Sequence, residues 1–159
     1  MNLPNWLTVS RILLIPLFVI VFYLPWAGAE VVAAVIFVIA AITDWLDGHL
    51  ARRWGQTSPF GAFLDPVADK LMVAVALIVV LQRDARPLMI LPVMVIISRE
   101  ITVSALREWM AEIGQRAKVA VSGLGKIKTT VQMVALVFLI GFQPDNVLHA
   151  AGVAGLYVA

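Results

Sequence analysis

Cysteine is absent from this sequence, and charged residues are scarce. Without cysteine the chain can form neither disulfide bonds nor a thiolate metal site. Histidine occurs only at His49 and His149, so any bound metal ion must be held mainly by oxygen ligands. Charged residues account for 14% of the chain, against about 25% in a typical soluble domain. This composition excludes an ordinary water-soluble globule, which needs a polar coat.

Hydrophobic residues make up most of the remainder. They account for 62% of the 159 residues, and the mean hydropathy is +0.95. A chain with so little polar surface must have lipid around its outside, where backbone N–H and C=O groups have to be satisfied within each segment. We therefore predict an all-α integral membrane protein with one domain over residues 1–159.

Long apolar segments alternate with short breaks rich in proline, glycine and polar residues. A membrane span needs about 20 mostly apolar residues. Segments of this kind lie at roughly 6–25, 29–52, 59–82, 87–110, 121–142 and 147–159. They predict a polytopic protein with six transmembrane helices. The last segment is shorter than the roughly 17 residues that a span requires, so we expect either that the chain is truncated or that its last helix is incomplete.

Lysine and arginine are distributed unequally between the two ends of these segments. If the N-terminus is cytoplasmic, Arg83 and Arg86 face outward, and the other 10 of the 12 basic residues lie toward the cytoplasm. Positively charged loops stay on the cytoplasmic side of a membrane. We therefore expect a multi-pass protein with a cytoplasmic N-terminus.

The end of the second segment places acidic, small and basic residues on one helical face. Positions i, i+3, i+4, i+7 and i+8 of an α-helix share a face. Here these positions are Asp44, Asp47, Gly48, Ala51 and Arg52. Two carboxylates therefore lie on the same side of this helix, near its cytoplasmic end.

The third segment begins with a matching stack. Gly61, Asp65 and Asp69 are spaced by four residues and share one helical face. A short loop joins the second and third segments, so the two helices run antiparallel. We therefore expect four aspartates to converge at the cytoplasmic end of the protein.

Four converging aspartates need a compensating positive charge. One acidic residue at a helix end is commonly just solvated, but each ionised aspartate within hydrocarbon costs about 2.5 to 3.5 kcal/mol, and like charges repel one another. Arg52 neutralises only one of the four. Carboxylate oxygens select Mg²⁺ or Mn²⁺, which keep positions open for phosphate. The small residues Gly48, Ala51 and Gly61 either allow close helix packing or leave room for a nucleotide or pyrophosphate.

The aspartates and small residues form one pattern of fixed spacing: Asp44-x2-Asp47-Gly48-x2-Ala51-Arg52-x8-Gly61-x3-Asp65-x3-Asp69. This pattern matches the signature of the CDP-alcohol phosphatidyltransferase family, which the chain therefore resembles. The resemblance extends over stretches at 4–11, 61–70, 99–108 and 125–129. The last three of these are similar to the bacterial phosphatidylglycerophosphate synthase branch of that family. Members of this branch join CDP-diacylglycerol to glycerol 3-phosphate and release CMP.

The resemblance implies a phospholipid-synthesising enzyme that binds two Mg²⁺ or Mn²⁺ ions. Its metal ligands would be Asp44, Asp47, Asp65 and Asp69. Asp69 would also be the general base for the glycerol hydroxyl. The CDP group would be bound by Asp44, Gly48, Ala51, Arg52, Gly61 and Thr8. The resemblance also implies a homodimer in the bacterial cytoplasmic membrane, with its active site facing the cytoplasm.

Glycerol 3-phosphate is a dianion, and its phosphate needs cationic partners. The candidates are Arg99, Lys126, Lys128, Arg107 and Arg11. Arg99 is the strongest, because it lies about 12 Å along its helix from Arg107 and is too deep to reach the headgroups easily. The alternative for the other cations is snorkelling to anionic headgroups, and Glu100 is an alternative, structural partner for Arg107.

Two other functions fit part of the pattern. Another family member would use inositol phosphate, serine or phosphatidylglycerol as acceptor, and the aspartate signature is shared by all of them. A small cation transporter also holds aspartates in the membrane, but near the midplane rather than at one face. CDP-diacylglycerol, glycerol 3-phosphate and membrane lipid are the expected partners, and no nucleic acid is expected.

Overall fold

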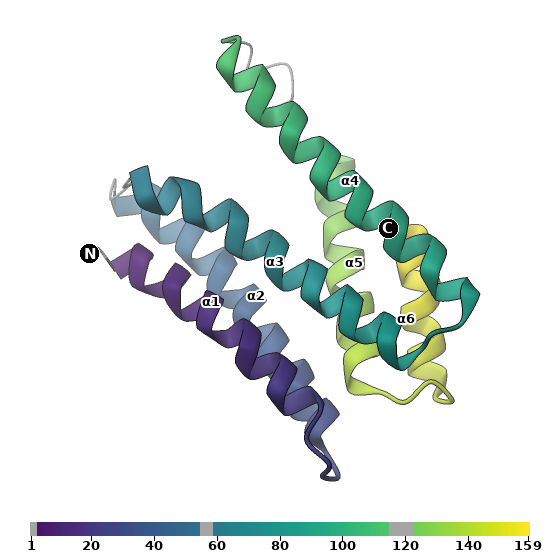
Figure 1. The fold of residues 1–159 in the computed structure, drawn as a ribbon. Helices are drawn as coiled ribbons and strands as arrows, with labels where there is room; N and C mark the ends of the chain where they lie inside the picture. The colour runs from purple at the N-terminus through teal and green to yellow at the C-terminus, as the bar shows by residue number, and fades with distance from the viewer. Residues whose placement is uncertain (1–2, 55–58, 115–122) are drawn as a thin grey trace.

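The polypeptide folds into antiparallel α-helices (Figure 1). The computed structural model describes the backbone of residues 3–54, 59–114 and 123–159. It describes the side chains of these ranges apart from 3–8, 45, 47–54, 59–63, 65–66, 123–124 and 126. Within the described ranges all regular structure is helical, which confirms the predicted all-α fold.

The described ranges contain six helices, as the apolar segments predict. They are α1 Leu3–Phe22, α2 Ala29–Trp54, α3 Pro59–Arg83, α4 Pro87–Glu112, α5 Gly123–Gly141 and α6 Val147–Val158. The observed bounds differ from the predicted ones by a few residues at most, because proline, glycine and polar breaks determine where helices end.

Local chemistry explains several of these bounds. Gly28 precedes α2 with a φ of +103°, in the left-handed region that favours glycine. Pro87 occupies the first turn of α4, where a missing N–H costs no helical hydrogen bond. Asn146 caps α6, because its side-chain oxygen accepts a hydrogen bond from the backbone N–H of Leu148 at 2.8 Å.

The helices assemble around a continuous apolar core. Helix α1 packs against α2 and α3, α2 packs against α5, and α5 packs against α6, while α4 contacts α3 and α6. Fully buried side chains at the centre include Phe18, Phe37, Leu77, Leu136 and Leu139. The start of α1, the end of α2 and the start of α3 lie together at one end of the molecule (Figure 1).

The contact between α5 and α6 is unusually close. A Cβ atom added at Gly152 would lie 2.9 Å from Cγ of Leu139 and 3.0 Å from the backbone oxygen of Ala135. A Cβ atom at Gly155 would lie 2.9 Å from Cβ of Ala135. Small residues therefore set the distance between these two helices, as they commonly do in membrane proteins.

The outward-facing surface is apolar. Leu13, Val95 and Val147 are 65%, 66% and 82% exposed, and large hydrophobic side chains are exposed on every helix. A surface of this kind needs lipid rather than water around it. Among the described residues, Pro87–Glu112 is the one helix that is long and apolar enough to cross a membrane, and Val9–Phe22, Ile127–Gly141 and Val147–Val158 are shorter apolar helices.

A buried polar cluster lies at the end of the molecule away from the start of α1. Asp84, in the turn between α3 and α4, receives two hydrogen bonds of 2.6 Å from the Arg86 guanidinium. His149 of α6 is fully buried, with Nε2 3.1 Å from Asp84 Oδ2 and Nδ1 3.0 Å from the carbonyl oxygen of Phe142. The cluster therefore ties the α3–α4 turn to α6.

This cluster predicts an acid-sensitive contribution to stability. The hydrogen bonds from Arg86 lower the pKa of Asp84 to about 2, against the opposing effect of burial. Because the folded-state pKa is depressed, the stabilisation is present above pH 4 and lost as the pH falls toward 2, and it amounts to roughly 2 kcal/mol. We expect the melting temperature in detergent to fall over that window, and Asp84→Asn to flatten the profile. The exposed Asp145→Asn is the matched control, and equal slopes in Asp84→Asn and the parent protein would contradict this assignment.

Candidate active site

A polar cavity of about 430 Å³ lies between α2, α3, α4 and α5. Its lining residues are Ala41, Asp44, Asp69, Lys70, Val73, Glu100, Thr129, Thr130, Gln132 and Met133. Asp44 comes from α2 and Asp69 from α3, so the structure brings these two predicted site residues together. Their juxtaposition follows from the helical spacing of the aspartates and from the antiparallel packing of the two helices.

Asp44 forms an ion pair with Arg11 of α1. Arg11 Nη1 lies 2.7 Å from Asp44 Oδ1, and the Arg11 side chain is only 1% exposed, whereas that of Asp44 is 40% exposed. The sequence-based hypothesis assigned Arg11 to the phosphate of the acceptor, whereas the structure places its charge against the Asp44 carboxylate. A buried guanidinium in this position fixes the carboxylate and partly neutralises it.

Several predicted site residues lie outside the described side chains. They are Thr8, Asp47, Gly48, Ala51, Arg52, Gly61, Asp65 and Lys126. Among the side chains that are described, no group of three or more His, Cys, Asp or Glu residues is arranged to hold a metal ion. The four-aspartate metal centre therefore stays a prediction.

Arg99, the strongest candidate for binding the acceptor phosphate, does not line the polar cavity but contacts two residues that do. Its Nη2 donates to Gln132 Oε1 at 2.8 Å and to Glu100 Oε1 at 3.1 Å. Its Nη1 donates to the carbonyl oxygen of Ala159 at 3.0 Å. Together with Lys128, Arg99 lines a second cavity of about 350 Å³ formed by α4, α5 and α6. The structure therefore separates Arg99 and Lys128 from the cavity that contains the aspartates.

Arg107 and Glu100 also differ from the sequence-based hypothesis that they pair. Arg107 is exposed in the last two turns of α4. Glu100 instead pairs with its neighbour Arg99 and lines the polar cavity. The i to i+7 spacing permits a contact between Glu100 and Arg107, but Glu100 pairs with the adjacent Arg99 instead.

The sequence-based reasoning missed the contribution of α5 to the polar cavity. Thr129, Gln132 and Met133 follow the i, i+3, i+4 pattern of one helical face, and all three line the cavity. A recognisable signal was present, because Gln132 is the only polar side chain between 131 and 141. A lone amide within an apolar helix has to be satisfied by a partner or a ligand.

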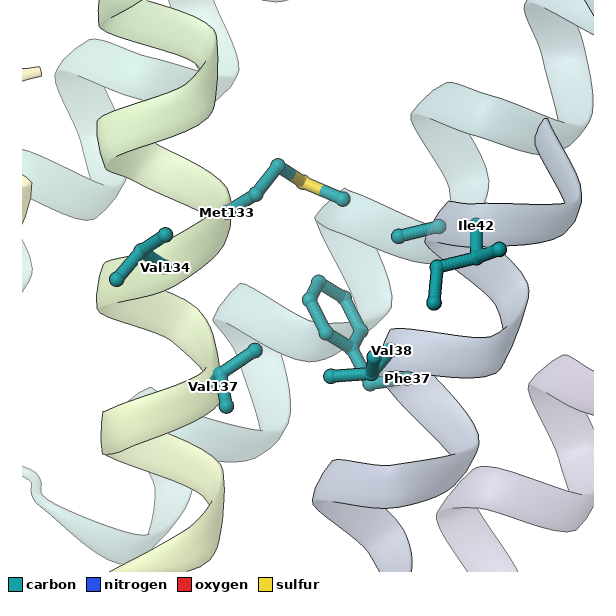
Figure 2. A pocket seen from close by; sticks show the side chains of 7 residues that line it. Phe37, Val38, Ile42, Met133, Val134 and Val137 are labelled. Atoms are coloured by element: carbon teal, nitrogen blue, oxygen red, sulfur yellow. The ribbon is translucent and has the colours of Figure 1, made fainter. Parts of the chain in front are cut away.

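An apolar groove adjoins the polar cavity between α2 and α5 (Figure 2). The groove has a volume of about 270 Å³ and is lined by Phe37, Val38, Ala41, Ile42, Met133, Val134 and Val137. Figure 2 shows Met133 reaching from α5 toward Ile42 of α2, above the ring of Phe37. Ala41 and Met133 line both spaces. A polar compartment and an apolar groove therefore meet at these two residues.

Comparisons with known proteins agree with the sequence pattern. The model of the CDP-alcohol phosphatidyltransferase family matches residues 1–158. A protein of Sodalis glossinidius named CDP-diacylglycerol--glycerol-3-phosphate 3-phosphatidyltransferase is 57% identical over 159 residues, which cover 100% of this chain and 87% of the relative. Relatives of the same name from Pectobacterium atrosepticum and Yersinia enterocolitica are 57% and 56% identical, over 99% and 100% of this chain and 86% and 87% of their own lengths.

Proposed function

The chain belongs to the CDP-alcohol phosphatidyltransferase family, and on that premise we propose that it transfers the phosphatidyl group of CDP-diacylglycerol to sn-glycerol 3-phosphate. The products are phosphatidylglycerophosphate and CMP. The observation that carries the proposal is the meeting of Asp44 and Asp69 in one cavity. The name shared by relatives that are 56 to 57% identical supports this choice of acceptor.

The reaction requires an alcohol to attack phosphorus. An oxygen of the glycerol hydroxyl forms the new P–O bond, and the P–O bond to CMP breaks. The alcohol becomes an effective nucleophile only as its proton leaves, so a carboxylate must lie within hydrogen-bond reach. Asp69 lines the cavity from α3, and we assign it the role of accepting this proton. Arg11 holds Asp44 of the same cavity through an ion pair of 2.7 Å.

The donor set fits a hard divalent cation. Asp44 and Asp69 supply carboxylate oxygens to one cavity, and the sequence spacing adds Asp47 and Asp65. Carboxylate oxygens suit Mg²⁺ or Mn²⁺, which, when bound, would polarise the pyrophosphate and stabilise the leaving CMP. The positive charge of Arg11 balances only part of the negative charge of such a cluster.

The apolar groove fits the lipid part of the donor. CDP-diacylglycerol has a charged head and two acyl chains, so its binding site must join a polar compartment to an apolar one. The polar cavity and the α2–α5 groove meet at Ala41 and Met133. We assign one acyl chain to this groove, with the pyrophosphate in the polar cavity.

We further propose that all six helices lie in the bacterial cytoplasmic membrane and that the aspartates face the cytoplasm. The exposed apolar side chains on every helix support this arrangement. The charge distribution supports the orientation. Arg83 is the last residue of α3 and Arg86 directly precedes α4, and the connection between these helices lies at the opposite end of the molecule from the start of α1 (Figure 1). Family resemblance favours a homodimer, which crosslinking in native membranes would test.

The decisive experiment measures CMP release by the purified protein with CDP-diacylglycerol and a panel of alcohols. We expect release with glycerol 3-phosphate and little with serine, inositol phosphate or phosphatidylglycerol. Because the assay follows the common leaving group, it reports on every acceptor equally. Release with another alcohol alone would overturn the acceptor assignment, and no release with any alcohol would overturn the transferase assignment.

A further inference from the structure

Gln132 is a buried amide between the polar cavity and Arg99, which lines the second cavity. Its side chain is 1% exposed, and the residue lines the cavity that contains Asp44 and Asp69. On its other side, its Oε1 accepts a 2.8 Å hydrogen bond from Arg99 Nη2. Gln132 therefore connects Arg99 to a cavity that Arg99 itself does not line.

The partner of Gln132 determines how its amide is oriented. A guanidinium group has only donors, so the amide oxygen must face Arg99 and the amide nitrogen must occupy the other branch of the planar group. Among the described residues, Arg99 is the hydrogen-bond partner found for this amide, and Nε2 is not one of the fully buried polar atoms that lack a partner. Because Gln132 lines the cavity that contains the aspartates, we infer that Nε2 reaches this cavity and can donate to an acceptor atom of a ligand there.

Arg99 is held by contacts within the protein and does not line the cavity that contains the aspartates. Its guanidinium is shared between Gln132, Glu100 and the carbonyl oxygen of Ala159, and Glu100 already balances its charge. The cavity itself is lined by a donor of another kind, the Lys70 ammonium. A ligand with several oxygens can accept hydrogen bonds from Lys70 and from the Gln132 amide.

We propose that Gln132 Nε2 donates a hydrogen bond to an oxygen of the phosphorylated acceptor, and that Arg99 is a positioning residue that fixes the amide. The proposal rests on the proposed function, because it identifies the acceptor as glycerol 3-phosphate. It also changes the role that the sequence assigned to Arg99, from a direct phosphate ligand to a residue that acts through Gln132.

Gln132→Glu tests the proposal directly. The substituted carboxylate keeps an oxygen facing Arg99 but replaces the Nε2 donor by a second, negatively charged acceptor. We expect the KM for glycerol 3-phosphate to rise by roughly one to two orders of magnitude, as for loss of a hydrogen bond to a charged group, while the KM for CDP-diacylglycerol changes little. A purely structural Gln132 would leave both constants at parent values, and that result would overturn the proposal.

Gln82→Glu provides a matched control. Gln82 lies near the far end of α3, and its Oε1 accepts a hydrogen bond from the Tyr23 hydroxyl at 3.0 Å, so the same substitution again preserves an oxygen contact. We expect no change in either KM. Gln132→Met, which removes donor and acceptor while keeping the apolar volume, should also raise the KM for glycerol 3-phosphate, and it decides the question if Gln132→Glu does not fold.

A double-mutant cycle tests the positioning role of Arg99. If Arg99 acts through Gln132, then Arg99→Lys raises the KM for glycerol 3-phosphate in the parent protein but adds little in the Gln132→Met background. Additive effects would show that Arg99 binds the acceptor independently and would overturn its positioning role. The parent protein distinguishes failure of the Gln132 proposal from failure of the proposed function. If the parent releases no CMP with glycerol 3-phosphate, the proposed function and the role of Gln132 are both overturned.

Discussion

Chelation of divalent metal ions should abolish CMP release, and added Mg²⁺ or Mn²⁺ should restore it. The reason is electrostatic, because Asp44 and Asp69 share one cavity with Glu100, and a substrate pyrophosphate adds further negative charge. Arg11, Lys70 and the Arg99 that pairs with Glu100 supply three positive charges beside these three carboxylates, which leaves the charge of the pyrophosphate unbalanced. The measurement is CMP release at increasing free metal concentration after exhaustive chelation.

Two further measurements separate metal binding from other effects of chelation. Asp44→Asn should raise the metal concentration needed for half-maximal rate by at least about tenfold, because it removes an anionic ligand. Divalent metal should also raise the melting temperature of the parent protein in detergent. At a metal concentration of 100 times the Kd, binding stabilises the folded state by about 2.7 kcal/mol. Full turnover in excess chelator, with a melting temperature that is independent of metal, would eliminate the metal centre.

Much of the fold could be predicted from the sequence, because its signals are local. The apolar segments and their proline and glycine breaks gave six helices with bounds that differ little from those observed. The meeting of Asp44 and Asp69 was also predictable. Both lie on helices joined by a short connection, so periodicity within each helix determines which faces meet.

The contacts between helices that are distant in sequence could not be predicted. Arg11 pairs with Asp44 because α1 packs against α2 at a particular height and rotation, and no local pattern encodes that register. Likewise, Gln132 and Glu100 reach the cavity from α5 and α4, whose orientation depends on packing throughout the bundle. Helix packing admits several geometries for the same apolar stripe, so local spacing does not determine which cavity each cationic side chain lines.

Asp69→Asn should lower the turnover rate by roughly 10² to 10⁴-fold, the range expected for loss of a general base. The side chain keeps its size and an oxygen for hydrogen bonding but can no longer accept the proton of the glycerol hydroxyl. Binding of CDP-diacylglycerol should weaken much less than the rate falls, because the missing interaction belongs to the transition state. Single-turnover kinetics at saturating metal, together with the Kd for CDP-diacylglycerol, measure the two effects separately.

Glu100 provides the competing explanation, because it is a second carboxylate from another helix in the same cavity. Its Oε1 already accepts a hydrogen bond from Arg99 at 3.1 Å, so this oxygen is engaged by the guanidinium rather than available to the glycerol hydroxyl. Glu100→Gln should therefore reduce the turnover rate less than Asp69→Asn does. Near-normal turnover in Asp69→Asn together with a collapse in Glu100→Gln would transfer the role of base to Glu100. It would also place the attacking hydroxyl nearer α4 than α3, on the side of the cavity where Gln132 holds Arg99.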